Sequence, residues 1–227
     1  MRLAVVLLAL GLSLDGLACG DVITLQTHAG TTTRYALTVP QGAKGALVDA
    51  PSDRTGDEGL GGFRAAPEHA EDLGKVVADV RKRVPGPVWL VGTSRGAISA
   101  ANAAGRLQGG AGADGVVLTS PVTVGTARGR MPWTAQTVYD APLGDIRIPV
   151  LLVGHAADAC QRSPASQLAE IARRLKADRV QSVTVTGGPG SRQAGLAACE
   201  GRSPHAFVEQ EAEVAAGIAR FVRGGQY

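Results

Sequence analysis

The chain has 227 residues, of which 44% are hydrophobic and 19% are charged. This length and composition fit one globular domain with a sizeable hydrophobic core. The formal net charge is only +3, and aromatic residues make up 4% of the chain. Because the basic residues are scattered and aromatic side chains for base stacking are few, we expect no nucleic acid partner.

The N-terminus has the pattern of a secretory signal peptide. Arg2 supplies a short positive region, Leu3–Leu14 is a compact apolar stretch, and Gly16–Ala18 has the small residues of a cleavage site. We therefore predict a signal peptide over residues 1–18 and a single domain over residues 19–227. An apolar stretch of about 12 residues is too short to cross a bilayer, so no membrane span is expected.

The predicted domain begins with an antiparallel hairpin. Val22–His28 and Thr31–Val39 alternate polar and apolar residues on either side of a glycine turn. Gly45–Asp49 is predicted to be a short buried strand, and Pro67–Val84 an amphipathic helix that a proline opens.

Strands and helices then alternate to the end of the chain. The predicted elements are strand 88–91, helix 97–107, strand 115–119, strand 148–154, helix 164–177, strand 179–186 and helix 206–222. This alternation predicts an α/β fold, with a mostly parallel sheet and helices on both of its faces.

A Gly-x-Ser-x-Gly sequence, Gly92 to Gly96, lies between the strand 88–91 and the helix 97–107. A chain that reverses this sharply at Ser94 leaves no room for bulky neighbours, which explains the glycine two residues away on either side. The helix that follows points its N-terminal amides toward the serine, where they stabilise negative charge. This setting predicts Ser94 as the nucleophile of a serine hydrolase.

An acid and a histidine follow the serine in the chain order that this architecture requires. Asp158 comes four residues after one predicted strand, and His205 lies in the loop after the next. In the expected mechanism, His205 takes the proton of Ser94 and Asp158 fixes the imidazole tautomer. The alternatives are a loop acid or helix cap for Asp158 and a packing histidine for His205, with Asp140 or Asp145 as the next acids to consider.

The other histidines and one further serine fit different roles. His28 and His69 precede Ser94 and are expected to pack or cap, whereas His155 lies in the same loop as the acid. Ser120 also ends a predicted strand, but it lacks flanking glycines and is a poor candidate for the nucleophile.

The chain resembles the α/β-hydrolase superfamily. Ser94, Asp158 and His205 match its nucleophile, acid and base, and residues 40–223 resemble its series of strands and helices. Three segments are similar, more narrowly, to a group of small exported bacterial serine hydrolases: Asp49–Asp53, Gly92–Asn102 and Ser203–Phe207. The resemblance implies the fold and the triad more strongly than it implies a substrate.

The chain departs from this superfamily before the nucleophile strand, where it is shorter by one strand–helix unit. Between the hairpin and the nucleophile strand the chain has room for only one strand, Gly45–Asp49. We expect this strand to lie beside the nucleophile strand, so that residues 50–53 border the active site. The backbone N–H of Arg95 is then expected to be the first oxyanion donor, and that of Ser52 or Asp53 the second. Because losing one donor lowers turnover by about 10² to 10³, an inactive protein is the alternative.

The chain has three cysteines. Cys160 follows the proposed acid by two residues and Cys199 precedes the proposed base by six, so a disulfide between them would join the two loops. Two unrelated reduced thiols are the alternative, and no Cys-x-x-Cys or paired-histidine spacing suggests a metal. A disulfide needs an oxidising compartment, which agrees with a secreted or periplasmic protein. Cys19, directly after the predicted cleavage site, leaves a lipid tether as a further alternative.

Together these features predict a secreted, monomeric serine hydrolase that cleaves carboxylic esters through an acyl-enzyme, without cofactor or metal. Met131, Trp133 and Tyr139 are expected either to line an open cleft for a small-molecule or polymeric ester or simply to pack at the sheet edge. The alternative function is that of a non-catalytic binding or scaffold protein on a degenerate hydrolase fold.

Overall fold

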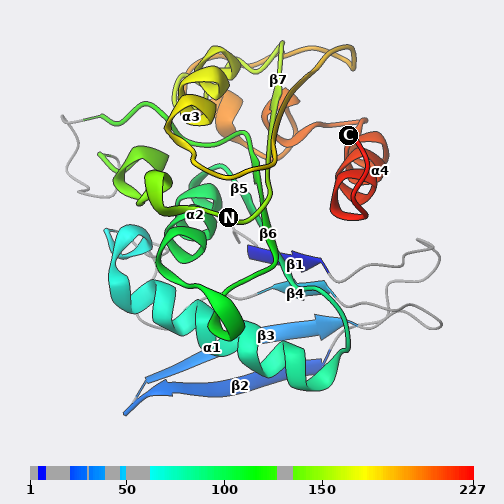
Figure 1. The fold of residues 1–227 in the computed structure, drawn as a ribbon. Helices are drawn as coiled ribbons and strands as arrows, with labels where there is room; N and C mark the ends of the chain where they lie inside the picture. The colour runs from blue at the N-terminus through cyan, green and yellow to red at the C-terminus, as the bar shows by residue number, and fades with distance from the viewer. Residues whose placement is uncertain (1–4, 9–20, 30, 39–46, 50–61, 127–134) are drawn as a thin grey trace.

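The strands of the protein form one sheet. A computed structural model describes residues 5–8, 21–29, 31–38, 47–49, 62–126 and 135–227 (Figure 1). The strands are β1 (Val5–Leu8), β2 (Asp21–His28), β3 (Thr31–Thr38), β4 (Leu47–Asp49), β5 (Trp89–Thr93), β6 (Gly115–Thr119), β7 (Val150–His155) and β8 (Val180–Val185). Within the described ranges they follow the order β2-β3-β4-β1-β5-β6-β7-β8.

The sheet has an antiparallel edge and a parallel half. β2 and β3 pair antiparallel with a register shift between Gln26 and His28, so the predicted hairpin is confirmed. β5, β6, β7 and β8 are all parallel to one another, as the alternation of strands and helices predicted. The carboxyl ends of these four strands therefore meet at one edge of the sheet.

Helices cover both faces of the sheet (Figure 1). They are α1 (Pro67–Arg83), α2 (Arg95–Arg106), α3 (Leu168–Arg174) and α4 (Glu211–Val222). Alternate side chains of a strand point to opposite faces. Leu90, Val116 and Leu152 thus pack with α1, α2 and α3, whereas the other set, which includes Trp89 and Leu151, packs with α4. Among the described residues, no helix is both long enough and apolar enough to cross a membrane.

One expectation about strand order is wrong. The short strand β4 does not lie beside the nucleophile strand β5, because β1 lies between them and pairs antiparallel with both. Unpaired backbone groups on β4 and β5 are thereby satisfied by a short apolar segment. This segment belongs to residues 1–18, and the structure is that of the chain with these residues attached, so their removal as a signal peptide stays a prediction.

The last predicted helix also begins later than expected. Pro204–Ala206 form a single 3-10 turn, and α4 starts only at Glu211. Phe207 and Glu209 have φ values of 58° and 62°, which no α-helix contains. The interruption leaves His205 in a loop rather than in the first turn of a helix. Helix 164–177 is likewise shorter, with a 3-10 turn at Ala165–Gln167 before α3.

Candidate active site

Ser94 occupies a strained turn between β5 and α2. Its φ is 55° and its ψ is −119°, a backbone conformation that non-glycine residues rarely adopt and that costs about 1–3 kcal/mol. A Cβ atom on Gly92 would collide with the carbonyl oxygen of Gly96 across this turn. Gly92 is therefore needed for the chain to reverse here, and Ser94 stands at the carboxyl edge of the sheet.

The first amides of α2 lie beside this serine. Arg95 is the first residue of α2, and the first four N–H groups of an α-helix have no acceptor inside the helix. The partial positive charge of the helix N-terminus adds to these donors. Arg95 thus has the position expected of an oxyanion donor, whereas Ser52, the proposed second donor, lies outside the described residues.

Asp158 and His205 meet in a buried pair. The Asp158 Oδ2 atom lies 2.8 Å from Nδ1 of His205, and the two side chains are only 1% and 3% exposed. The other carboxylate oxygen, Oδ1, accepts a hydrogen bond of 2.8 Å from the backbone N–H of Cys160. The structure therefore brings together the proposed acid and base, 47 residues apart in sequence.

This contact fixes the role of each imidazole nitrogen. A carboxylate only accepts hydrogen bonds, so Nδ1 of His205 carries the hydrogen and Nε2 presents a lone pair. Nε2 is buried, and the described part of the chain offers it no hydrogen-bond partner, Ser94 included. A buried acceptor left in this way is costly, and a substrate or nucleophile proton at this atom would satisfy it. In enzymes without substrate, the bond from nucleophile to base is often long and shortens only in the Michaelis complex.

Ser94 and His205 are linked through the end of β6. The backbone N–H of Ser94 donates to the carbonyl oxygen of Thr119 at 2.9 Å. The next residue, Ser120, donates its hydroxyl hydrogen to the carbonyl oxygen of His205 at 2.8 Å. Ser120 is buried and has a φ of 42°, a second strained residue at this edge. Its hydroxyl thus holds the base at the strand end that also holds the nucleophile.

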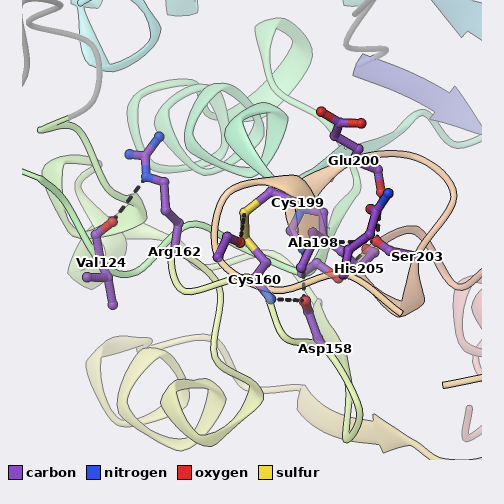
Figure 2. The surroundings of a disulfide bond; sticks show 12 residues. Val124, Asp158, Cys160, Arg162, Ala198, Cys199, Glu200, Ser203 and His205 are labelled. Carbon is purple, nitrogen blue, oxygen red and sulfur yellow. Dashed lines mark hydrogen bonds and ion pairs between the residues drawn. A yellow bond between two sulfur atoms is a disulfide. The ribbon is translucent and has the colours of Figure 1, made fainter. Parts of the chain in front are cut away.

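A disulfide joins the loop of the acid to the loop of the base. Cys160 and Cys199 are bonded, with Cα atoms 4.7 Å apart and a sequence separation of 39. Figure 2 shows the bridge beside Asp158 and His205. Cys160 Sγ, Asp158 and His205 are close enough to suggest metal ligands. The sulfur is not a free thiolate, however, so this set offers a metal only two ordinary ligands.

The fold was compared with known proteins. In sequence, no family model and no curated protein matches this chain. In structure, an esterase from the Planctomycetes species Thermogutta terrifontis covers 89% of this chain and 92% of its own, with 16% identity and a TM-score of 0.59. A predicted CIB-like hydrolase from Thermoplasma acidophilum covers 88% and 99%, with 14% identity and a TM-score of 0.53. The chain has the α/β-hydrolase fold.

A second histidine supports the acid loop of this hydrolase fold. Nδ1 of His155 accepts from the backbone N–H of Ala157 at 3.0 Å, so Nε2 carries the hydrogen and donates to Oε1 of Gln210 at 2.8 Å. The Gln210 amide donates in turn to the carbonyl oxygen of Thr186 at 3.0 Å. These bonds tie the ends of β7 and β8 to the start of α4. His155 was expected near the acid, whereas nothing in the sequence pointed to Gln210.

The remaining site predictions have mixed outcomes. Met131 and Trp133 lie outside the described residues. The Tyr139 hydroxyl donates to Oε1 of Gln167 at 3.2 Å, and Arg174 lies 4.3 Å from the ring centroid. Burial raises the pKa of Tyr139. These contacts agree with the packing alternative for Tyr139, and its place in a cleft stays a prediction.

One alternative acid, Asp140, and two of the other histidines make contacts of their own. Asp140 caps a 3-10 turn, accepting from the backbone N–H of Thr137 at 2.7 Å. His28 lies 3.1 Å from Asp72, and His69 is buried against Phe63. These contacts agree with the packing or capping roles expected of the two histidines.

The surroundings of the nucleophile are positively charged. Burial, and then the positive charge of Arg95, lower the pKa of Arg64 to about 10. The same two causes lower the pKa of Arg162, and burial lowers that of Arg95 itself. All three guanidinium groups are thus partly desolvated, and Arg64 and Arg162 each lie close enough to Arg95 for its charge to act on them.

Replacing Ser120 by alanine is expected to lower kcat about fivefold to tenfold, because one buried hydrogen bond that positions His205 is lost. Ser120→Gly also lacks the hydroxyl but accommodates the positive φ, so it should lower kcat as Ser120→Ala does. The measurement is kcat and KM for a 4-nitrophenyl ester, together with the thermal unfolding midpoint. Ser182→Ala, on the exposed face of β8, is the matched control. An unchanged kcat in Ser120→Ala would show that the hydroxyl does not position the base.

Proposed function

We propose that this protein is a serine hydrolase that cleaves carboxylic esters through an acyl-enzyme. The observation that carries the proposal is that Ser94, His205 and Asp158 all lie at the carboxyl edge of the parallel strands. Ser94 lies in the strained turn before α2, and the buried His205–Asp158 pair presents an imidazole lone pair. A serine nucleophile, a histidine base and an acid that orients the base are the groups that acyl transfer through an acyl-enzyme requires.

In the proposed first step, Ser94 Oγ attacks the acyl carbonyl carbon while His205 Nε2 takes its proton. The carbonyl oxygen becomes an oxyanion that accepts from the Arg95 N–H at the start of α2. Asp158 stabilises the imidazolium and stays ionised. The C–O bond then breaks, His205 returns the proton to the departing alkoxide, and the alcohol leaves an acyl group on Ser94.

In the second step, water replaces the alcohol. His205 takes a proton from water, the hydroxide attacks the acyl-serine carbonyl, and the proton passes back to Ser94 Oγ as the carboxylic acid departs. All atoms balance as ester plus water giving acid plus alcohol. The step needs no group beyond Ser94, His205, Asp158 and the backbone donors, so we propose an enzyme without cofactor or metal.

Esters of small acids are the proposed substrates. Structures of the Thermogutta terrifontis esterase with propionate bound and with butyrate bound are similar to this chain, with TM-scores of 0.59 and 0.57. Propionate and butyrate are short carboxylates of the kind that ester hydrolysis releases. At 15–16% identity they support the proposal for this chain only as relatives in fold.

We propose in addition that the enzyme acts outside the cytoplasm. The signal-peptide pattern over residues 1–18 supports export. The Cys160–Cys199 bridge supports it independently, because such bonds persist in secreted and periplasmic proteins. A lipid tether at Cys19 is the proposed alternative to free secretion.

A fluorophosphonate probe is expected to label the protein once, on the peptide that contains Ser94. An activated serine attacks phosphorus as it would attack an acyl carbon, whereas ordinary serines do not react. Mass spectrometry of the digested adduct checks the site. Ser94→Ala should abolish labelling and ester hydrolysis, and Ser182→Ala should leave both unchanged. Labelling that persists undiminished in Ser94→Ala would place the nucleophile elsewhere, and no labelling at all would favour the non-catalytic scaffold.

A further inference from the structure

His155 closes the turn that places the acid. It is the last residue of β7, is 1% exposed and comes three residues before Asp158. Its carbonyl oxygen accepts from the backbone N–H of Asp158 at 3.0 Å, and its ring atom Nδ1 accepts from the backbone N–H of Ala157 at 3.0 Å. Two consecutive amides of the acid loop therefore end on this one residue, and the position of Asp158 depends on the His155 side chain as well as on its backbone.

The opposite side of the imidazole faces the segment that carries the base. Nε2 of His155 donates to Oε1 of Gln210 at 2.8 Å. The backbone N–H of Gln210 donates to the carbonyl oxygen of Phe207 at 2.8 Å, and its side-chain amide donates to the carbonyl oxygen of Thr186 at 3.0 Å. Thr186 and Phe207 lie on either side of His205 in the chain, so Gln210 fastens both ends of the segment that contains the base.

The chemistry of these contacts gives His155 a geometric role. The Gln210 amide nitrogen also lies 3.5 Å from Oε2 of Glu213, and an amide nitrogen placed near two oxygens leaves its own oxygen toward the imidazole. His155 then carries its hydrogen on Nε2 and its lone pair on Nδ1, the reverse of His205. Both nitrogens are used within the protein, so His155 offers no lone pair to a substrate or to the nucleophile.

This connection is separate from the disulfide. The disulfide holds the acid through a residue that follows it and the base through a residue that precedes it. His155 precedes the acid and Gln210 follows the base, so the Asp158–His205 contact is held from both sides. Groups that react together must be kept within about 0.5 Å of the productive geometry by the residues around them. The His155–Gln210 pair is placed to supply this constraint on the side that the disulfide does not reach.

We propose that His155 and Gln210 are positioning residues, whose hydrogen bonds hold Asp158 and His205 where the base can take the proton of Ser94. This inference rests on the proposed ester hydrolysis and adds two residues to its mechanism. Both side chains are buried and bonded within the protein. Their loss should therefore slow the chemical step and leave ester binding unchanged.

The first test is His155→Phe, which keeps an aromatic ring beside Phe207 and removes both nitrogens. We expect kcat for 4-nitrophenyl acetate to fall about tenfold, the scale of a lost buried hydrogen bond, with KM unchanged. The rate of fluorophosphonate labelling of Ser94 should fall by the same factor, because that reaction uses the same base without an ester. Gln210→Met keeps the length of the side chain, removes its amide and should lower kcat in the same way.

Two further variants separate the two bonds of His155. His155→Asn places an acceptor oxygen where Nδ1 stands, and asparagine readily accepts from the backbone N–H two residues on. His155→Gln reaches Gln210 but leaves the N–H of Ala157 without its acceptor. Because the bond to Ala157 lies next to the acid, His155→Asn should recover most of the lost kcat and His155→Gln little of it.

His69→Phe is the matched control. His69 is also 1% exposed and also packs against a phenylalanine, Phe63, with ring centroids 5.3 Å apart, but it lies on α1. This replacement should lower the thermal unfolding midpoint and leave kcat unchanged, with every rate measured well below the midpoint of each variant. The comparison separates a displaced triad from the general loss of a buried histidine.

The two proposals fail in different ways. An active wild type with unchanged kcat in both His155→Phe and Gln210→Met would overturn this inference and leave the proposed function standing. A His155→Asn variant no faster than His155→Gln would overturn the assignment to the Ala157 bond. If His155→Phe does not fold, Gln210→Met and this comparison decide. A wild type that neither hydrolyses esters nor is labelled at Ser94 would remove the proposed function and this inference together.

Discussion

Asp158→Asn is expected to lower kcat about 10⁴-fold with little change in the fold. The carboxylate now accepts from Nδ1 of His205 at 2.8 Å and so keeps the lone pair on Nε2. An asparagine amide in the same place donates to Nδ1 instead, which moves the imidazole hydrogen to Nε2. Nε2 then carries a hydrogen and has no lone pair to accept the proton of Ser94, so the serine loses its base.

The measurement is single-substrate kinetics on 4-nitrophenyl acetate with circular dichroism to confirm folding. His205→Ala should remove nearly all turnover as well, since it deletes the base itself. Asp178→Asn, exposed in the loop before β8, is the matched control and should behave like the wild type. An Asp158→Asn variant with near-normal kcat would mean that the buried Asp158–His205 contact is structural only.

The parallel half of the fold was predictable because local signals agree there. Val116 and Val117 point to opposite faces of β6 and are both fully buried, which is the apolar run that a covered parallel strand requires. The nucleophile turn was predictable for a similar reason. The turn spans only the five residues Gly92 to Gly96, and its glycine pattern can be interpreted from local steric limits, without any contact to distant residues.

The start of α4 and the position of β1 were not predictable from local sequence patterns. The start of α4 depends on positive φ values at Phe207 and Glu209, neither of which is a glycine. The position of β1 depends on backbone groups that β4 and β5 leave unpaired, and these belong to segments about 40 and 80 residues further along the chain. A sequence pattern reports the character of β1 as apolar and short, but not which strands it joins.

The residues of the candidate site also fall into two groups, those predicted from the sequence and those that only the structure revealed. Ser94, Asp158 and His205 are predicted from chain order and strand ends, and the structure brings Asp158 and His205 into contact. Ser120 was judged only as a poor nucleophile, and its role in holding the carbonyl of His205 came from a contact across 85 residues. Gln210 is a comparable case, since its partner His155 lies 55 residues away. Polar residues that position others leave no periodic signal in the sequence.

Loss of the Cys160–Cys199 bridge is expected to abolish the proposed activity at a temperature below that of global unfolding. The bridge closes a loop of 39 residues that contains β8, with the acid just before its start and the base just after its end. On the chain-entropy model, opening such a loop lowers the free energy of unfolding by about 4 kcal/mol. The parallel strands keep their own packing, so the loops that hold Asp158 and His205 should loosen first.

The double variant Cys160→Ala/Cys199→Ala tests this without leaving a reactive thiol. Its activity and its far-ultraviolet circular dichroism are followed against temperature, with Cys19→Ala as the control. We expect the two curves to separate in the double variant and to coincide in the wild type and in Cys19→Ala. Peptide mapping of the exported protein without reductant should show one Cys160–Cys199 crosslink. If both thiols are alkylated without reductant, the bridge is absent, and the argument for an oxidising compartment then has only the N-terminal pattern to support it.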